Sequence, residues 1–222
     1  LFIGDIVGRP GRDLLRRHLK ALVAAHDVDL VIANGENTAG GAGITRDNAV
    51  EILGAGVNVI TTGNHVWDKR EALGFIVSEP RLLRPANYPE GTPGLGSYVA
   101  VSRSGVRVGV VNVMGRVFLH AIDDPFRAAN REIARVKQDG AQVVFVDMHA
   151  ETTSEKVALG WYLDGQVAAV VGAGEWATRP EFSYRHTWSL GDMVIWDNTG
   201  TMHRATHYDY DSGRLMHRTK LE

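Results

Sequence analysis

Short apolar runs alternate with longer amphipathic stretches along this chain. The apolar runs are rich in Val, Ile and Leu, which is typical of buried strands. The stretches between them repeat their leucines at helical spacing, most clearly within residues 13–25. The pattern predicts strands at 1–3, 30–33, 57–61, 98–101, 106–113, 143–146 and 167–171, and helices at 13–25, 47–53, 70–77, 125–137 and 154–162.

This alternation predicts an α/β protein whose sheets are mostly buried. Strands 98–101 and 106–113 flank Ser104-Gly105, so they are expected to pair as a hairpin. In open α/β sheets, functional residues gather at the carboxyl ends of the strands. A site is therefore expected where these strands end.

Composition narrows the class of protein. The chain has 222 residues, is 44% hydrophobic and 23% charged, and has a formal net charge of -2, so bulk nucleic-acid binding is not expected. It lacks cysteine, which excludes disulfides, thiolate zinc sites and a Cys nucleophile. It also lacks an apolar run of the roughly 20 residues that a membrane span needs. Leu1 already lies in an expected strand, so we predict no signal peptide, a few residues lost from the front, and a cytoplasmic protein.

Metal-ligand residue types follow nearly every predicted strand. Singly, an Asp after a strand is usually a turn or cap residue, and Asn-Gly pairs usually form turns. Together, Asp, Glu, Asn and His at successive strand ends predict a dinuclear metal centre, for which mixed oxygen and nitrogen ligands suit Mn, Fe or Zn. Two such metals can clamp a phosphate and activate water. The clusters are Gly4-Asp5, Asn34-Gly35-Glu36-Asn37, Gly63-Asn64-His65, Asn112 to Arg116, and Asp147 to Glu151.

These clusters, with their flanking residues, resemble the motifs of the YmdB-type metallophosphoesterases. The matching segments, in chain order, are residues 4–12, 35–41, 63–68, 112–116 and 147–156. The resemblance runs from residue 1 to about Gly172. It implies a four-layer α/β sandwich, two divalent metal ions (Fe or Mn), and hydrolysis of small phosphodiesters such as 2′,3′-cyclic nucleotides. It allows a homo-oligomer.

The resemblance also implies roles for individual residues. Asp5 and Asn37 would bind the first metal, and Glu36 would bridge both metals. Asn64 and His149 would bind the second metal. His65 would give a proton to the leaving oxygen, a role that suits imidazole near neutral pH.

Two neighbouring residues carry weaker expectations. Asp68 follows His65 by three positions, and either orients that imidazole or is an ordinary turn residue. Arg116 is a candidate for contact with the substrate phosphate.

The family pattern ends abruptly after Gly172. There the family has Thr-His-Thr-His, and its two His complete the two metals. This chain has Ala173-Gly174-Glu175-Trp176 instead. Each metal is therefore one ligand short, and Glu175 is a candidate replacement.

Residues 177–222 resemble the C-terminal end of TauD/TfdA-type 2-oxoglutarate-dependent dioxygenases. His203 matches the last Fe(II) ligand, and Arg214 and Arg218 match the arginines that bind the 2-oxoglutarate carboxylate. The upstream His-x-Asp of such a site is missing, because the one in this chain, at residues 207–209, follows His203 too closely.

We therefore predict a metallophosphoesterase domain at 1–172, incomplete at its C-terminus, and a short β-rich segment at 173–222. The join would lie near residues 172–176 and leave sheet edges exposed. Of three functions, a metal-dependent phosphodiesterase is favoured. The alternatives are a fragment of a 2-oxoglutarate dioxygenase and a catalytically impaired chimera that binds a metal or nucleotide.

Overall fold

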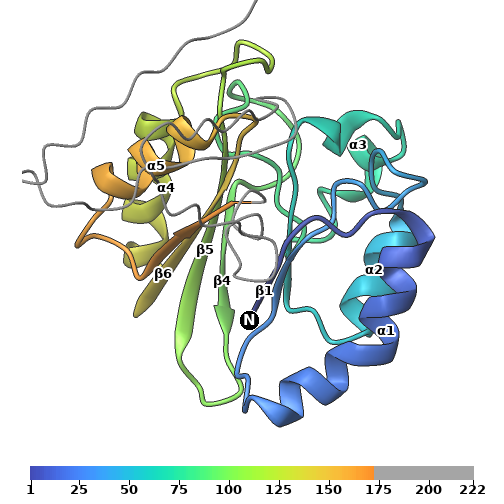
Figure 1. Ribbon diagram of the computed structural model, residues 1–222. Helices are drawn as coiled ribbons and strands as arrows, with labels where there is room; N and C mark the ends of the chain where they lie inside the picture. Colours follow the sequence, from blue (N-terminus) through green and yellow to red (C-terminus); the bar gives the residue numbers. More distant parts are fainter. Residues whose placement is uncertain (173–222) are drawn as a thin grey trace, which may run out of the picture. The chain divides into compact units, whose positions relative to one another are not determined.

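The computed structural model describes residues 1–172, which form two β-sheets with helices on their outer faces (Figure 1). The first sheet is wholly parallel. Its strands, in spatial order, are β1 (Phe2–Ile3), β2 (Ile32–Asn34) and β3 (Val59–Thr61). The second sheet is mixed, because β4 and β5 form the expected antiparallel hairpin and the other pairs are parallel. Its order is β4 (Ser97–Val101), β5 (Arg107–Met114), β6 (Val143–His149) and β7 (Ala169–Val171).

The helices divide between the two sheets. The first sheet is accompanied by α1 (Gly8–Ala25), α2 (Arg46–Gly54), the 3₁₀ helix η1 (Asn64–Trp67) and α3 (Ala72–Phe75). The second is accompanied by α4 (Pro125–Gln138) and α5 (Thr153–Tyr162). None of these helices is long and apolar enough to cross a membrane.

Three apolar cores lie between the layers. Leu19 of α1 and Ile52 of α2 pack with Ile60 of the first sheet. The outer core of the second sheet contains Ile133, Val146 and Leu159. A third core joins the sheets through Ile32, Val59 and Val110. Burying each such side chain contributes about 1.5–3 kcal/mol to stability. Because the three cores join helices to sheets and one sheet to the other, the layers stack in the order helix, sheet, sheet and helix. The expected four-layer α/β fold is confirmed.

Helix α1 begins five residues before its predicted start at Asp13. Its first turn, Gly-Arg-Pro-Gly-Arg, has none of the apolar periodicity that marks the rest of the helix and contains residues that usually break helices. Proline is tolerated in a first turn because its missing N–H would have no helical partner there. The Gly8 N–H donates instead to the Asn37 carbonyl at 2.9 Å, which joins this turn to the segment after β2.

Helix α4 matches its sequence signals closely. The Asp124 carboxylate accepts hydrogen bonds from the backbone N–H groups of Phe126 and Arg127 at 2.8 and 3.0 Å, and Pro125 opens the helix. The helix ends before Gly140, whose φ of 86° suits a glycine that terminates a helix.

The segment after α3 joins the two sheets. Leu82 bridges to Ile60 of β3, and four residues later the Ala86 N–H donates to the Asn112 carbonyl of β5 at 2.7 Å. This connection ties the carboxyl-terminal half of β5 to the first sheet.

Candidate metal centre

The predicted site residues come from both sheets. Asp5 follows β1, Glu36 and Asn37 follow β2, and Asn64 begins η1 just after β3. From the second sheet comes His149, the last residue of β6. Their side chains form two groups of contacts at the carboxyl ends of the strands, one within the first sheet and one between the two sheets.

Asp5 and Asn37 form one part of the cluster. The Asn37 amide Nδ2 donates to Asp5 Oδ1 at 2.8 Å. Asp5 has φ of 23°, an uncommon backbone angle for a residue other than glycine, and such outliers cluster at functional sites. Asn37 Oδ1 is buried and has no hydrogen-bond partner among the described residues. Its lone pairs are thus available to a cation.

Glu36, His149 and Asn64 form the other part, which crosses between the sheets. His149 Nδ1 lies 3.1 Å from Glu36 Oε1, and His149 Nε2 lies 2.7 Å from Asn64 Oδ1. The backbone N–H of His65 donates to Glu36 Oε2 at 3.2 Å. Glu36 is 2% exposed, so its carboxylate is held almost wholly by these contacts.

Burial governs the charges in this cluster. It raises the pKa of Glu36 to about 7, an effect opposed by the His65 N–H and reinforced by the negative charges of Asp5 and Asp147. Burial likewise lowers the pKa of His149 to about 4, helped by the charge of Lys156. His149 is therefore neutral at pH 7, and its contact with Glu36 is a hydrogen bond rather than an ion pair. Neutral imidazole is the form that binds metals.

The donor set fits a divalent cation. Oxygen atoms contact both ring nitrogens of His149, but a neutral imidazole has a single N–H to donate. The second nitrogen presents a lone pair beside the carboxylate and amide oxygens. A cation would also relieve the repulsion among Glu36, Asp5 and Asp147 that helps to raise the pKa of Glu36.

Gly63 keeps this meeting point open. A Cβ atom at this position would lie 2.4 Å from His149 Cγ and 2.5 Å from Glu36 Oε2. Only glycine lets the backbone after β3 approach both side chains this closely. The Gly-Asn-His sequence thus has a steric reason for its glycine.

Amides form an essential part of the predicted centre. Within residues 1–172, no group of three or more His, Cys, Asp or Glu side chains is arranged to hold a metal ion by itself. The cluster adds the amide oxygens of Asn37 and Asn64 to its carboxylates and imidazole. Such oxygen-rich mixed sets suit Mn and Fe.

His65 lies at the exposed side of the cluster. Its Nδ1 is 2.7 Å from Asp68 Oδ2, and its side chain is 41% exposed. Of the two expectations for Asp68, this contact matches the orienting role. With Nδ1 turned toward Asp68, Nε2 is the ring atom left to exchange a proton with a ligand.

Arg116 does not contact the predicted ligands. Its guanidinium is half-exposed and lies 3.9 Å from the Asp124 carboxylate, while its backbone N–H donates to Glu155 Oε1 at 2.8 Å. Its contact with phosphate stays a prediction.

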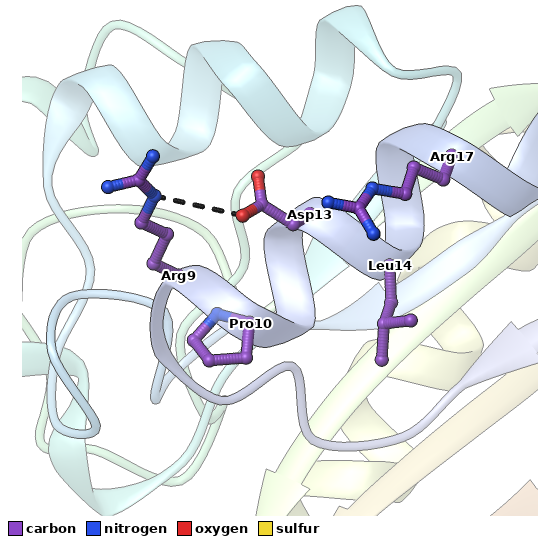
Figure 2. Close-up of a pocket in the computed structure, with 5 residues that line it drawn as sticks. All are labelled: Arg9, Pro10, Asp13, Leu14 and Arg17. Carbon is purple, nitrogen blue, oxygen red and sulfur yellow. Dashed lines mark ion pairs between the residues drawn. The ribbon is translucent and has the colours of Figure 1, made fainter.

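A separate hollow of about 430 Å³ lies along α1 (Figure 2). Arg9 and Asp13, one turn apart on the helix, line it and form an ion pair at 3.7 Å, and Leu14 adds an apolar edge. None of the predicted ligands lines this hollow, so it is distinct from the candidate centre.

Three buried polar residues lie next to the cluster, namely Thr61, Asn112 and Asp147; the last two belong to the predicted strand-end clusters but were not assigned as ligands, and Thr61 was not singled out. They are at most 1% exposed and hydrogen-bond to one another or to adjacent backbone. The available signal was a polar residue inside an otherwise apolar strand, as in Val-Val-Asn-Val-Met and Val-Phe-Val-Asp-Met. The expectations for Glu175, His203, Arg214 and Arg218 concern positions outside the described residues.

The fold and cluster have counterparts in known proteins. The chain is 47% identical over 172 residues to the 2′,3′-cyclic-nucleotide 2′-phosphodiesterase of Bacillus subtilis (strain 168), which covers 78% of this chain and 64% of that protein. The crystal structure of a phosphatase from Mycoplasma pneumoniae matches with a TM-score of 0.69 and 32% identity, covering 77% of this chain and 62% of that one. The chain thus spans somewhat under two thirds of these relatives.

A short segment is similar to a different class of protein. It is 36% identical over 80 residues to the alpha-ketoglutarate-dependent 2,4-dichlorophenoxyacetate dioxygenase of Burkholderia sp. (strain RASC), which covers 36% of this chain and 25% of the dioxygenase. The partial resemblance to TfdA-type dioxygenases is confirmed as a match to about a third of this chain.

The larger resemblance is confirmed over a slightly longer stretch than the sequence analysis expected. The model of the YmdB-like proteins matches residues 1–177, where the motifs indicated about 172. Over these residues, the chain belongs to the family of YmdB-like proteins.

Proposed function

We propose that this chain is a metal-dependent phosphodiesterase that hydrolyses small phosphodiesters, with 2′,3′-cyclic nucleotides as the substrate class. The observation that carries the proposal is the donor set of Asp5, Glu36, Asn37, Asn64 and His149, in which Asn37 Oδ1 is buried without a hydrogen-bond partner among the described residues. The activity of the B. subtilis relative indicates the same reaction class.

Asp5 and Asn37 would hold one metal, Asn64 and His149 the other, and Glu36 would bridge them. Two such ions supply a clamp for phosphate oxygens and a nucleophilic water at neutral pH. Fe or Mn suits this mixture of carboxylate, amide and imidazole ligands. The protein's own contribution is a donor set in which Glu36 is buried and His149 is held neutral.

His65 would act on the leaving group. Hydrolysis of a cyclic phosphodiester releases a sugar alkoxide, which is a poor leaving group unless it is protonated. Asp68 holds His65 Nδ1 at 2.7 Å, so the ring presents Nε2 as the atom that transfers the proton. The 41% exposure of the side chain leaves room for a substrate to reach it.

The proposed setting is the cytoplasm, where a chain without cysteines loses no stabilising disulfide. A homo-oligomer is compatible with the proposal, since every proposed ligand belongs to one chain. The dioxygenase alternative is disfavoured, because the matched segment covers a quarter of the dioxygenase.

The decisive experiment combines metal analysis with turnover on the full chain. Purified protein is assayed for bound metal by mass spectrometry, and hydrolysis of bis-p-nitrophenyl phosphate and 2′,3′-cyclic AMP is followed with added Mn(II). We expect close to two metals per chain and turnover of both compounds. A folded chain that binds no metal and hydrolyses neither compound would overturn the proposal. Turnover of the synthetic diester alone would keep the reaction class and reject cyclic nucleotides as the substrate.

A further inference from the structure

A buried polar network lies directly beneath the candidate centre and joins the two sheets. Thr61 Oγ1, at the end of β3, donates to Asp147 Oδ2 of β6 at 2.5 Å. The Thr62 N–H donates to Asn112 Oδ1 of β5 at 3.0 Å. Asn112 and Asp147 face each other in the parallel register of β5 and β6. The network therefore spans one strand of the first sheet and two of the second.

The network lies next to the proposed ligands along each strand. Thr61 precedes Asn64 by three residues, and its carbonyl accepts a hydrogen bond at 2.9 Å from Gly35, the neighbour of Glu36. Asp147 precedes His149 by two residues on the rigid strand β6. The negative charge of Asp147 also acts on Glu36. A movement between Thr61 and Asp147 would thus shift ligands of both sheets.

An apolar pair would be the ordinary choice for such a position. Thr61 is fully buried and Asp147 is 1% exposed. A buried carboxylate is costly unless it is hydrogen-bonded, and buried polar pairs often contribute less stability than apolar residues of the same volume. Their best-attested use is to fix one arrangement of the elements that they join. We therefore expect this polar pair to fix the arrangement of β3 and β6 rather than to add stability.

We propose that Thr61 and Asp147 are positioning residues whose hydrogen bond sets β3 against β6, so that Asn64 and His149 meet at the metal centre. This inference rests on the metal centre proposed above. Neither side chain is assigned a contact with substrate. For comparison, losing a group that hydrogen-bonds directly to a metal ligand typically changes metal affinity about 10–100-fold.

The test measures Mn(II) affinity by titration calorimetry on the full chain, independently of turnover. Thr61→Val removes the donor but keeps the shape, and we expect Mn(II) to bind about 10–100-fold more weakly. Thr61→Ser keeps the hydroxyl and should bind Mn(II) within about threefold of the wild type, since the outer contact is retained.

A matched control comes from the second sheet, to which Asp147 belongs. Ser97 of β4 is also 1% exposed, and its hydroxyl donates to the Glu132 carboxylate at 2.8 Å. Ser97→Ala should lower the melting temperature of the metal-free protein about as much as Thr61→Val but leave Mn(II) affinity unchanged. Equal losses of affinity in both variants would mean that any buried hydroxyl–carboxylate pair has this effect, which would overturn the positioning role.

Asp147→Leu completes a double-mutant cycle, because it removes the acceptor while keeping a side chain of similar shape. If the hydrogen bond is the unit that acts, the double variant should bind Mn(II) no more weakly than the worse single variant. Independent, multiplying losses would show that the two side chains act separately and would reject the proposal. Wild-type affinity in a folded Thr61→Val variant would reject it too, while the metal centre would stand. A wild-type chain that binds no Mn(II) would remove the metal centre and this inference together.

Discussion

The two sheets contribute to the candidate centre in opposite ways. The first sheet is wholly parallel, and Asp5, Glu36, Asn37 and Asn64 all lie beyond the ends of its strands. The second sheet supplies His149 as the last residue of a seven-residue strand. The first half thus presents its ligands on the segments that follow its strands, including Asp5 with its unusual φ, and the second half presents a ligand within a strand.

This contrast indicates which ligand positions the fold must fix. Segments outside the strands can adjust to a cation, whereas a residue within a paired strand keeps the position that the sheet gives it. The first-sheet ligands would therefore adapt to His149. Whatever fixes the distance between the sheets, from the shared apolar core to the Thr61–Asp147 contact, would then set the geometry of the centre.

The largest effects should come from removing one ligand of each sheet. We expect Asp5→Ala and His149→Ala each to abolish turnover. Changes in contacts outside the ligand set already lower metal affinity or activity by about 10–100-fold, and losing a ligand should lower it further. Each variant should keep about one metal per chain, since each loses a ligand of a different ion. Metal content and hydrolysis of bis-p-nitrophenyl phosphate measure both expectations.

Glu36→Ala provides the complement, because the proposed bridge belongs to both ions. It should bind less metal than either of the other variants. Full activity in both Asp5→Ala and His149→Ala would show that the ligand assignment is wrong.

The next effect concerns proton transfer rather than metal binding. His65→Ala should lower kcat for 2′,3′-cyclic AMP by about 10²–10⁴-fold while metal content stays unchanged. The loss should be much smaller for bis-p-nitrophenyl phosphate, because p-nitrophenolate leaves readily without a proton. Asp68→Asn should show the same pattern in weaker form, since it removes the charge that holds Nδ1. Equal losses for both substrates would argue against the proton-donor role.

The sequence predicted the elements and the converging strand ends but placed some boundaries wrongly. The start of α1 was missed because Gly-Arg-Pro-Gly-Arg carries no apolar period, and its stability as a first turn depends on the contact between Gly8 and Asn37. The 3₁₀ helix η1 was missed for a similar reason, since Gly63-Asn64-His65 appears only as the end of a strand.

The family resemblance, rather than periodicity, separated ligands from other polar residues. Asn37 and Asn112 are both amides near the ends of strands, and no local signal ranks one above the other. The structure distinguishes them, because Asn112 Oδ1 accepts a hydrogen bond from Thr62 while Asn37 Oδ1 has no partner among the described residues. Such differences depend on contacts between distant parts of the chain, which a single sequence does not contain.

A moderate effect should follow from filling the space between the sheets. Gly63→Ala places a methyl group within 2.5 Å of both His149 and Glu36, so one of them must move. We expect Mn(II) to bind at least about tenfold more weakly, because displacing a ligand contact lowers metal affinity. Overpacking should also lower the free energy of unfolding by about 1–3 kcal/mol. Gly74→Ala is the matched control, because its Cβ would meet nothing within 4 Å, and both properties should stay near wild type.

The smallest effects should come from the outer helices, where the two halves are alike. Asp124 caps α4 beside the second sheet, and Thr45 caps α2 beside the first by accepting from the Asn48 N–H at 3.2 Å. Replacing either by Ala should cost about 1 kcal/mol and leave metal content unchanged. Because one apolar core joins the sheets, both variants should unfold in a single transition when followed by circular dichroism. Two separate transitions, each shifted by the cap on its own side, would instead mean that the halves fold independently, and the sheets could not then hold His149 against Glu36 as one unit.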